Sequence, residues 1–348
     1  MSVQCDDLDL LRGLVDHYSP SRQEEDAVSF LVESMEQRGI NSYIDGAGNA
    51  VGEVGDGFPH IALVGHIDTV KGIIPVRENS GCLYGRGTVD AKGPLATFVA
   101  AVSRFTKLDQ GRITVVGAVE EECPTSRGAR YLVDQMKPDH VFIGEPSGWD
   151  SITIGYKGIV GFNFKLKQSN AHFAGNNLRS GDKAITFYNN LLSYLNQHEI
   201  KSEFGSPRLE LRRINTIDEG LSENVEAYFS VRIPPGYGVE NLINFIEVQS
   251  GDAEIECDQK LEGIIAKKNT PLVRALLQGI RQEGGQPTFK KKTGTSDMCV
   301  IGPEWKCPIV AYGPGDSSLD HTPDEHIILD DYLRSIQVMT NALKSLIL

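Results

Sequence analysis

The chain has 348 residues, of which 40% are hydrophobic and 23% are charged, and this ordinary globular composition argues against a disordered or low-complexity protein. A chain of this length is expected to form about two domains. Its formal net charge of −13 argues against duplex nucleic acid as a partner and fits a cationic ligand such as a metal ion better.

The cysteines and the apolar runs of the sequence indicate the cellular compartment of the protein. The six cysteines are scattered without any CxxC pair, which is typical of free thiols in a reducing compartment. Residues 1–7 are acidic and lack the basic and apolar regions of a signal peptide. No apolar run approaches the roughly 18 residues of a membrane span. We therefore expect a cytoplasmic protein with no membrane partner.

The first long helical pattern covers residues 21–39. Its apolar positions recur at helical spacing, and Gly39 follows them as a stop signal. Ser21 and Glu24 stand three residues apart at its start, a spacing that predicts a capping box.

Residues 61–143 alternate between two patterns. Short continuous apolar runs predict strands that are buried on both faces, at 61–64, 113–116 and 141–143. Helical patterns lie between them, at 94–105 and 127–136. Buried strands that alternate with helices indicate an α/β fold, in which a mostly parallel sheet is covered by helices on both faces.

The hydrophobic period changes after about residue 156. Apolar and polar residues alternate strictly over 160–167 and again over 225–233. This period of two is typical of antiparallel strands with one buried face and one wet face. Helical stretches at 182–197 and 239–249 are expected to cover the buried face.

The first pattern returns after about residue 263. Thr270 and Pro271 open a helix, residues 308–312 form another buried run, and a last helix begins near 329. We therefore predict a discontinuous α/β metal-binding catalytic domain of residues 1–155 and 264–348, with an inserted α+β antiparallel domain of residues 156–263.

Metal-binding residue types follow the predicted buried strands, and one more carboxylate lies in a glycine-rich loop before a helix. They are His66, Asp68, Glu120–Glu122, Glu145, Asp316, Asp320 and His321, with Asp90 in the loop. Singly, each has an ordinary explanation as a hydrogen-bonded histidine, a turn aspartate or a solvated charge. In open parallel sheets, however, ligands bind beyond the carboxyl ends of the strands. The joint occurrence therefore favours zinc or a similar divalent ion, and the surplus of acids suits two bridged ions.

Five motifs resemble, in the same order, those of the co-catalytic zinc aminoacylases and carboxypeptidases, a family that includes acetylornithine deacetylase and succinyl-diaminopimelate desuccinylase. They are residues 65–70, residues 85–93, the Glu120–Glu122 triplet followed by Gly128, residues 144–147 and residues 321–325. The inserted antiparallel domain is similar to the lid or dimerisation domain of that family. The resemblance thus covers essentially the whole chain and implies a homodimer.

The resemblance implies two divalent metal ions per subunit, zinc first and cobalt as the alternative. Their ligands would be His66, Asp90, Glu122, Glu145 and His321. Asp90 would bridge the ions, and the resemblance implies a cis peptide bond between Asp90 and Ala91.

The resemblance also implies roles for two residues that do not bind metal. Asp68 would orient His66 from behind, and Glu121 would be the general base of amide hydrolysis. Most members have a pair of acids where this chain has three. The spacing to Gly128 favours Glu121 and Glu122 for the two roles and leaves Glu120 outside both.

Candidate substrate contacts lie in other segments. His172 resembles the histidine that reaches the oxyanion in the partner's site of family dimers, and its alternative is a surface-loop histidine. Arg232 could hold a substrate α-carboxylate bidentately, and its alternative is an ordinary exposed sheet arginine. Gly294 and Thr295 resemble a motif that binds one end of the substrate.

The stretches 116–122, 293–298 and 311–317 most resemble the branch that hydrolyses LysW-lysine. There the bond that breaks joins the γ-carboxyl of the carrier's C-terminal glutamate to the α-amine of lysine or, in some members, ornithine. The implied partner is the acidic carrier protein LysW, and the implied role is lysine or arginine biosynthesis.

Charge raises a difficulty for this interpretation. An acidic enzyme repels an acidic carrier unless basic groups cluster near its cleft, and Lys290–Lys292 or the group Arg208, Arg212 and Arg213 could provide such a cluster. The alternatives are a deacetylase of N-acetylornithine or N-acetyllysine, and a metal-free binding module of the same fold. The complete set of ligand-type residues argues against the metal-free module.

Overall fold

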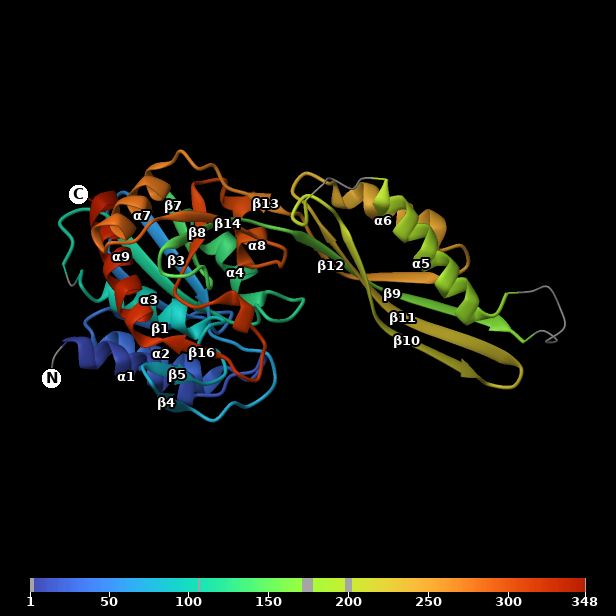
Figure 1. Cartoon of the computed structure of the whole chain (residues 1–348), viewed down its shortest axis with the longest axis horizontal. Helices are drawn as coiled ribbons and strands as arrows, with labels where there is room; N and C mark the ends of the chain where they lie inside the picture. Colours follow the sequence, from blue (N-terminus) through green and yellow to red (C-terminus); the bar gives the residue numbers. More distant parts are fainter. Residues whose placement is uncertain (1–2, 106, 171–177, 198–201, 348) are drawn as a thin grey trace. The chain divides into compact units, whose positions relative to one another are not determined.

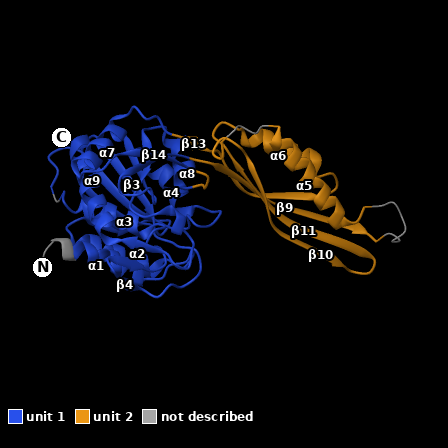
Figure 2. Cartoon of the chain, viewed as in Figure 1, with its two compact units in different colours: residues 1–155, 266–291, 296–348 blue, residues 156–265, 292–295 orange. Residues whose placement is uncertain are grey.

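The computed structural model describes residues 3–105, 107–170, 178–197 and 202–347. The chain divides into two compact units (Figure 2). Unit 1 comprises Met1–Gly155, Ala266–Lys291 and Ser296–Leu348, and unit 2 comprises Tyr156–Ile265 and Lys292–Thr295. The short segment 292–295, which lies outside the insertion expected from the sequence, belongs to unit 2, where the Lys157 amide donates to the Lys292 carbonyl oxygen.

The main sheet lies in unit 1 (Figure 1). Its strands there run in the order β1-β2-β6-β3-β7-β15-β8, with β14 also paired to β8. Its strands are β1 (Asn41–Ile44), β2 (Ala50–Gly55), β3 (His60–His66), β6 (Arg112–Ala118), β7 (His140–Gly144), β8 (Ser151–Tyr156), β14 (Thr288–Lys292) and β15 (Ile309–Tyr312). The central strands β6, β3, β7 and β15 are mutually parallel. They are the continuous apolar runs of the sequence, so the predicted α/β class is confirmed.

Helices cover both faces of this sheet. They are α1 (Val3–Asp16), α2 (Glu25–Gln37), α3 (Lys92–Val102), α4 (Arg127–Gln135), α7 (Pro271–Gln282), α8 (Asp297–Trp305) and α9 (Leu329–Ile347), with the 3₁₀ turn η1 (Ser317–Leu319). The connections β3-α3-β6 and β6-α4-β7 cross the sheet in opposite directions, so right-handed crossovers place α3 and α4 on opposite faces. α3 and α7 pack against α9, and α4 packs against α8. None of the helices in the described ranges is long and apolar enough to cross a membrane.

Two features of unit 1 differ from the sequence-based expectation. A small antiparallel sheet of β4 (Arg77–Asn79), β5 (Cys82–Tyr84) and β16 (His326–Ile328) was not predicted. The capping-box prediction is wrong, because α2 begins at Glu25 and the side chain of its N-cap residue, Glu24, makes no capping hydrogen bond. The Ser21 hydroxyl bonds instead to the distant Asp68, and the Glu24 carboxylate accepts from the distant Glu120 amide as well as from the nearby backbone of Arg22.

Unit 2 is an antiparallel sheet in the order β10-β11-β9-β12, packed against α5. Its strands are β9 (Gly158–Ser169), β10 (Arg208–Asp218), β11 (Ser222–Ile233) and β12 (Glu254–Leu261), the two-residue β13 (Ile264–Ile265) follows them, and its helices are α5 (Ser180–Asn196) and α6 (Val239–Gln249). The alternating apolar residues of β9 and β11 form a separate core with both helices. The predicted α+β architecture of this region is therefore confirmed.

Candidate metal centre

The first group of predicted site residues lies where β3 ends. His66 is the last residue of β3 and is 2% exposed. Its Nδ1 lies 2.9 Å from the carbonyl oxygen of Asp68, which can only accept, so Nδ1 carries the hydrogen. This tautomer leaves the Nε2 lone pair free to bind a metal ion, and Nε2 lies 3.2 Å from Asp90 Oδ1.

Asp90 lies between two imidazoles that come from distant parts of the chain. Its Oδ1 faces His66, and its Oδ2 lies 3.0 Å from His321 Nε2. The same His321 nitrogen lies 2.9 Å from Glu122 Oε1. The peptide bond between Asp90 and Ala91 is cis, so that prediction is confirmed.

The donor set fits the metal chemistry expected from the sequence. Ligand atoms of His66, Asp90 and Glu122 lie within 4.8 Å of one another. His321 adds a second imidazole through its contact with Asp90, so one carboxylate presents an oxygen to each of two histidines. Mixed nitrogen and oxygen ligands of this kind suit zinc or a similar divalent ion.

Electrostatics also favour a bound cation at this centre. Burial raises the pKa of Glu121 well above its ordinary value, and the charges of Asp297, Glu145 and Glu122 raise it further. Burial likewise raises the pKa of Glu122, with Asp90 as the next cause. Hydrogen bonds to Asp90 and Glu122 raise the pKa of His321 to about 10. Where several buried acids surround two histidines, a divalent ion relieves the repulsion between the acids.

Asp68 joins His66 to the acid triplet. It is 0% exposed, and its Oδ1 lies 3.5 Å from His66 Nδ1. The amides of Glu121 and Glu122 donate to its two carboxylate oxygens, each at 3.0 Å, and the Ser21 hydroxyl donates to Oδ2 at 2.7 Å. These contacts place the Asp68 carboxylate beside His66, and they hold the backbone of Glu121 and Glu122.

The three acids of the triplet have different surroundings. β6 ends at Ala118, and Glu120 turns the chain with a positive φ of 62°. The Glu120 carboxylate lies 2.8 Å from Arg127 Nε, and it accepts a hydrogen bond from Thr125. Only Glu122 of the three belongs to the metal-type group among the described residues.

The other predicted site residues are placed as follows. Glu145 directly follows β7 in unit 1 and is buried, and its charge raises the pKa of Glu121. Arg232, on β11 of unit 2, donates a hydrogen bond to Thr295. Gly294 precedes Thr295 in the same unit, and a Cβ added there would meet nothing within 4 Å. His172 lies outside the described residues.

Sequence reasoning missed a buried support for Asp90. Glu325 is 0% exposed, and its Oε1 accepts hydrogen bonds from the amides of Val89 at 2.9 Å and Asp90 at 3.1 Å. Its other oxygen accepts from Arg86 at 2.7 Å. Lys92 Nζ, two residues beyond Asp90, donates to carbonyl oxygens at the end of α1. Both side chains belong to motifs that the sequence had already singled out, but their tertiary partners are far away in the chain.

Asp297 is a second buried acid that was not singled out. It is the first residue of α8 and is 3% exposed, and its Oδ1 has no hydrogen-bond partner among the residues that the structure describes. Burial raises its pKa to about 7. The sequence did offer one signal that Asp297 belongs to the site, because it directly follows Thr295 and Ser296 in a stretch that resembles a family motif.

Residues 62–345 match peptidase family M20/M25/M40. The chain belongs to this family. The resemblance to metal-dependent amide hydrolases and the prediction of a hydrolase are thereby confirmed. The chain is 40% identical to the LysW-lysine hydrolase of Deinococcus radiodurans over 97% of this chain and 96% of that one. It is 27% identical to the LysW-lysine/LysW-ornithine hydrolase of Sulfurisphaera tokodaii over 98% and 95% of the two chains.

Solved structures share the fold at low sequence identity. The dipeptidase Dug1p of Saccharomyces cerevisiae superposes with a TM-score of 0.80 at 13% identity, over 99% of this chain and 98% of that one. The Bacillus subtilis YxeP protein, described as a dinuclear metal-binding peptidase of the M20 family, gives 0.69 at 13% identity, over 98% and 97%. Both matches cover unit 1 and unit 2 together.

Proposed function

We propose that this family member hydrolyses, in the cytoplasm, the amide bond between the γ-carboxyl of the C-terminal glutamate of LysW and the α-amine of lysine, and also of ornithine, for lysine or arginine biosynthesis. The observation that carries the proposal is the 40% identity to a LysW-lysine hydrolase along almost the full length of both chains. The convergence of His66, Asp90, Glu122 and His321 supports an active hydrolase rather than a metal-free module.

The metal centre would hold two divalent ions, with zinc as the first candidate and cobalt as the second. The ligands would be His66, Asp90, Glu122, Glu145 and His321. Such ions, when bound, supply Lewis acidity to the scissile carbonyl and lower the pKa of water. The pair of oxygens that Asp90 turns toward two different imidazoles supports its role as the bridge.

Glu121 would carry the proton transfers. A carboxylate oxygen of Glu121 takes a proton from the attacking water and returns it to the departing α-amine, so no net proton remains on the enzyme. Asp68 would hold Glu121 in place through the Glu121 amide and would keep His66 in its ligand tautomer.

Substrate contacts would come from unit 2. Arg232 would bind the α-carboxylate of lysine or ornithine, and its hydrogen bond to Thr295 supports a defined direction for the guanidinium. The open space around Gly294 is suited to substrate that approaches the backbone closely. His172 would donate to the oxyanion.

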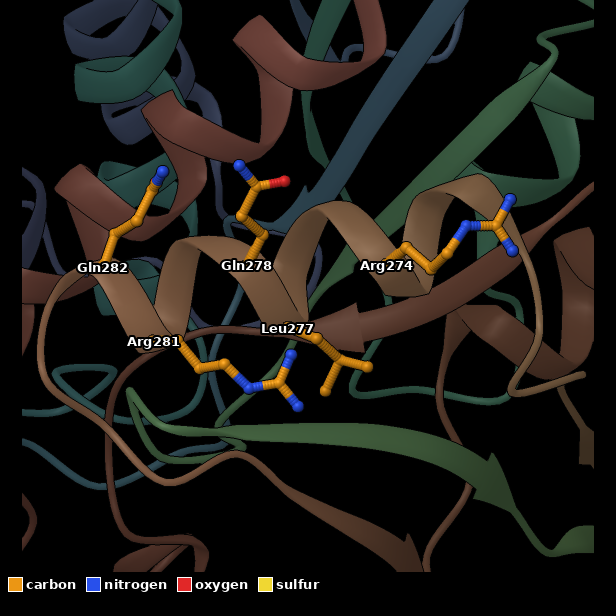
Figure 3. A pocket seen from close by; sticks show the side chains of 5 residues that line it. All are labelled: Arg274, Leu277, Gln278, Arg281 and Gln282. Atoms are coloured by element: carbon orange, nitrogen blue, oxygen red, sulfur yellow. The ribbon is translucent and has the colours of Figure 1, made fainter.

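One stretch of unit 1 supports an attraction for the acidic carrier. Residues 266–291 contain six basic residues and one acidic residue, although the whole chain carries −13. Arg274 and Arg281 of α7 line a pocket of about 470 Å³ with Leu277 and two glutamines (Figure 3). Lys290 Nζ donates to the Ser147 carbonyl oxygen, on the loop that begins at Glu145. We assign this basic stretch as the surface that attracts the acidic carrier.

The direct test is hydrolysis of LysW-lysine, LysW-ornithine, acetyllysine and acetylornithine side by side, with metal analysis of the purified protein. We expect the LysW conjugates to be cleaved with the highest kcat/KM and about two metal ions per chain. An acetylated amino acid that reacts faster than either conjugate would instead establish the deacetylase alternative, and a protein without metal and without turnover would establish the binding module.

Charge reversal tests the carrier surface separately. The double variant Arg274→Glu, Arg281→Glu is expected to raise KM for LysW-lysine at low salt without changing kinetics on a small N-acyl amino acid. Lys344→Glu, an exposed position on α9, is the control. An equal effect of the control on KM would contradict a specific surface.

A homodimer through unit 2 is the final part of the proposal. The edge strand β10 exposes Leu211, Ile214 and Ile217, each at least 40% accessible, and pairs only with β11 among the described strands. Exposed aliphatic side chains on an edge strand suit association with a second copy. Sedimentation of a chain without residues 156–263 is the test, and we expect a monomer. A dimer that persists would contradict this assignment.

A further inference from the structure

Residues 19–24, the segment before α2, run beside the chain that follows β3. The Thr69 amide donates to the Ser19 carbonyl oxygen at 2.9 Å, and the Ser21 amide donates to the Thr69 carbonyl oxygen at 3.2 Å. An isolated parallel bridge joins the same two stretches. This pairing holds the segment next to Asp68.

Two side chains of the segment contact the supports of the metal centre. The Ser21 hydroxyl donates to Asp68 Oδ2 at 2.7 Å, and Glu24 Oε1 accepts from the Glu120 amide at 3.2 Å. Glu24 is 3% exposed, although it stands at the start of a helix. Its side chain makes no hydrogen bond that caps α2, although its carboxylate is also hydrogen-bonded to the backbone of Arg22 and of Glu24 itself. Both polar groups therefore connect the segment before α2 to the acid triplet and its support.

The Ser21 contact fixes a carboxylate that has several partners. Asp68 Oδ2 accepts from both Ser21 and the Glu122 amide, and Oδ1 accepts from the Glu121 amide. A rotation of the Asp68 carboxylate would displace both amides together. Ser21 is a side-chain donor to Oδ2 and opposes such a rotation, while His66 Nδ1 lies 3.5 Å from Oδ1.

The Glu24 contact fixes the turn that aims the triplet. Glu120 has a positive φ of 62°, which is uncommon for a residue with a Cβ. Its amide is held by Glu24, and its carboxylate is held by Arg127. This left-handed turn determines the directions in which Glu121 and Glu122 leave β6.

We propose that Ser21 and Glu24 are positioning residues of the metal centre. Ser21 holds the Asp68 carboxylate, Glu24 holds the Glu120 backbone, and together they set the positions of Glu121 and Glu122. The proposal rests on the base and ligand roles proposed above for these two acids. The positioning role requires a hydrogen-bond donor at position 21. At position 24 it requires a hydrogen-bond acceptor, which need not be charged.

The experiment compares truncating with conservative variants. Ser21→Ala and Glu24→Ala remove the groups, whereas Ser21→Thr keeps a hydroxyl donor and Glu24→Gln keeps a carbonyl acceptor. Ser29→Ala and Glu25→Ala are the matched controls, since both lie on α2, the Ser29 hydroxyl donates to the Glu25 carbonyl oxygen of the same helix, and both residues are exposed. Each variant is measured for kcat and KM, for zinc loss to a chelator, and for amide hydrogen exchange of Glu121 and Glu122 in the metal-free protein.

We expect the two alanine variants to lose about tenfold in kcat with little change in KM, because each removes a hydrogen bond that orients the reacting groups. Zinc loss and exchange at Glu121 and Glu122 should accelerate, while the threonine, glutamine and control variants stay near wild type. If an alanine variant does not fold, its conservative partner supplies the test, and a tenfold loss of kcat in Glu24→Gln would overturn the acceptor role.

Unchanged exchange and zinc loss in both alanine variants would overturn the proposal, even if their melting temperatures fall. Neither readout needs a substrate. Exchange and zinc loss therefore test the positioning role even if the LysW conjugates prove not to be substrates. A failure of the positioning role can thus be distinguished from a failure of the proposed function.

Discussion

The strand-end edge of unit 1 and the core of unit 2 are stabilised by different kinds of contact. At the edge, charged side chains such as Asp68, Glu145 and Glu325 are less than 10% exposed and depend on specific partners. In unit 2 the centre is aromatic: the rings of Phe162 and Phe187 lie 5.4 and 5.6 Å from that of Phe229. Burial of charge costs free energy unless it is paired, whereas burial of rings stabilises directly. The edge thus holds its charged side chains at a cost in stability that the aromatic centre of unit 2 does not bear.

The two units can be observed separately in one chain. Both tryptophans, Trp149 and Trp305, belong to unit 1. Tryptophan fluorescence therefore reports unfolding of unit 1, while far-UV circular dichroism reports both units. Substitutions confined to one unit therefore show whether the two units are stabilised independently.

The largest effect is expected at Glu121. Glu121→Gln keeps the size and polarity of the side chain but cannot accept a proton, so kcat should fall roughly 10²- to 10⁴-fold while metal content stays at the wild-type level. Turnover and metal analysis of the same preparation provide the measurement.

Neighbouring acids provide the controls for Glu121. Glu122→Gln removes an anionic ligand, so metal should dissociate more readily and excess metal should restore part of the activity. Glu120→Gln should keep both metal and turnover, because the Glu120 carboxylate pairs with Arg127 outside the metal-type group. If Glu120→Gln were instead inactive and kept its metal, Glu120 would be the base and Glu121 the ligand, so the assignment of the triplet would be wrong by one residue.

The next largest effect is expected in the aromatic core of unit 2. Phe229 is 0% exposed, and Phe229→Ala is expected to cost about 3–5 kcal/mol of the unfolding free energy of unit 2, since it leaves a cavity among aromatic rings. In urea unfolding, the circular dichroism signal should shift while the tryptophan midpoint and the metal content stay the same. A tryptophan midpoint that moves equally would show that the two units unfold together.

A buried charge of unit 1 should give the reverse pattern. Glu325→Gln removes one partner of the ion pair with Arg86, and breaking a buried pair costs about 3 kcal/mol. The tryptophan midpoint should fall, because the affected pair lies in unit 1. Glu53→Gln, which breaks the more exposed pair with Arg112, is the control and should cost less than about 1 kcal/mol. Equal losses in the two variants would contradict the role of burial.

The smallest effect concerns a helix end away from the charged edge. Thr270 caps α7, and its side chain accepts a hydrogen bond from the Val273 amide at 3.2 Å. Thr270→Ala should cost about 1 kcal/mol, and Thr270→Ser should cost less because serine keeps the cap. Thermal unfolding followed by fluorescence measures both variants. A serine variant as unstable as the alanine variant would show that the methyl group, not the cap, matters.

Local patterns predicted the parts of the fold whose contacts are local. The central parallel strands are continuous apolar runs, and the start signals of α7, the cap Thr270 and the first residue Pro271, lie next to the turn that they begin. The Ser21 and Glu24 spacing misled for the opposite reason, since the side-chain partners are 47 and 96 residues away. A strand such as β4 could not be predicted, because its three residues are all polar and exposed and show no alternation of apolar and polar residues.

The site could be anticipated further than its supports. His66, Asp90 and Glu122 were named because strand ends and motif order single them out, and the structure brings their ligand atoms together. The burial of Glu325 and Asp297 could not be predicted, because nothing in their local sequence distinguishes them from acidic residues on the surface. The pairing of Glu325 with the Asp90 backbone depends on an approach across more than two hundred residues.

The chain leaves and re-enters unit 1 at adjacent points of one sheet. The amide of Ala266, where the chain returns, donates to the carbonyl oxygen of Ile154, just before it departs, at 2.7 Å. A segment whose two ends are hydrogen-bonded neighbours can be lengthened, shortened or exchanged without rerouting the surrounding strands. Residues 156–265 can therefore be exchanged as one continuous segment, whereas residues 292–295, the rest of unit 2, stay at the end of β14 and before α8 when that segment changes.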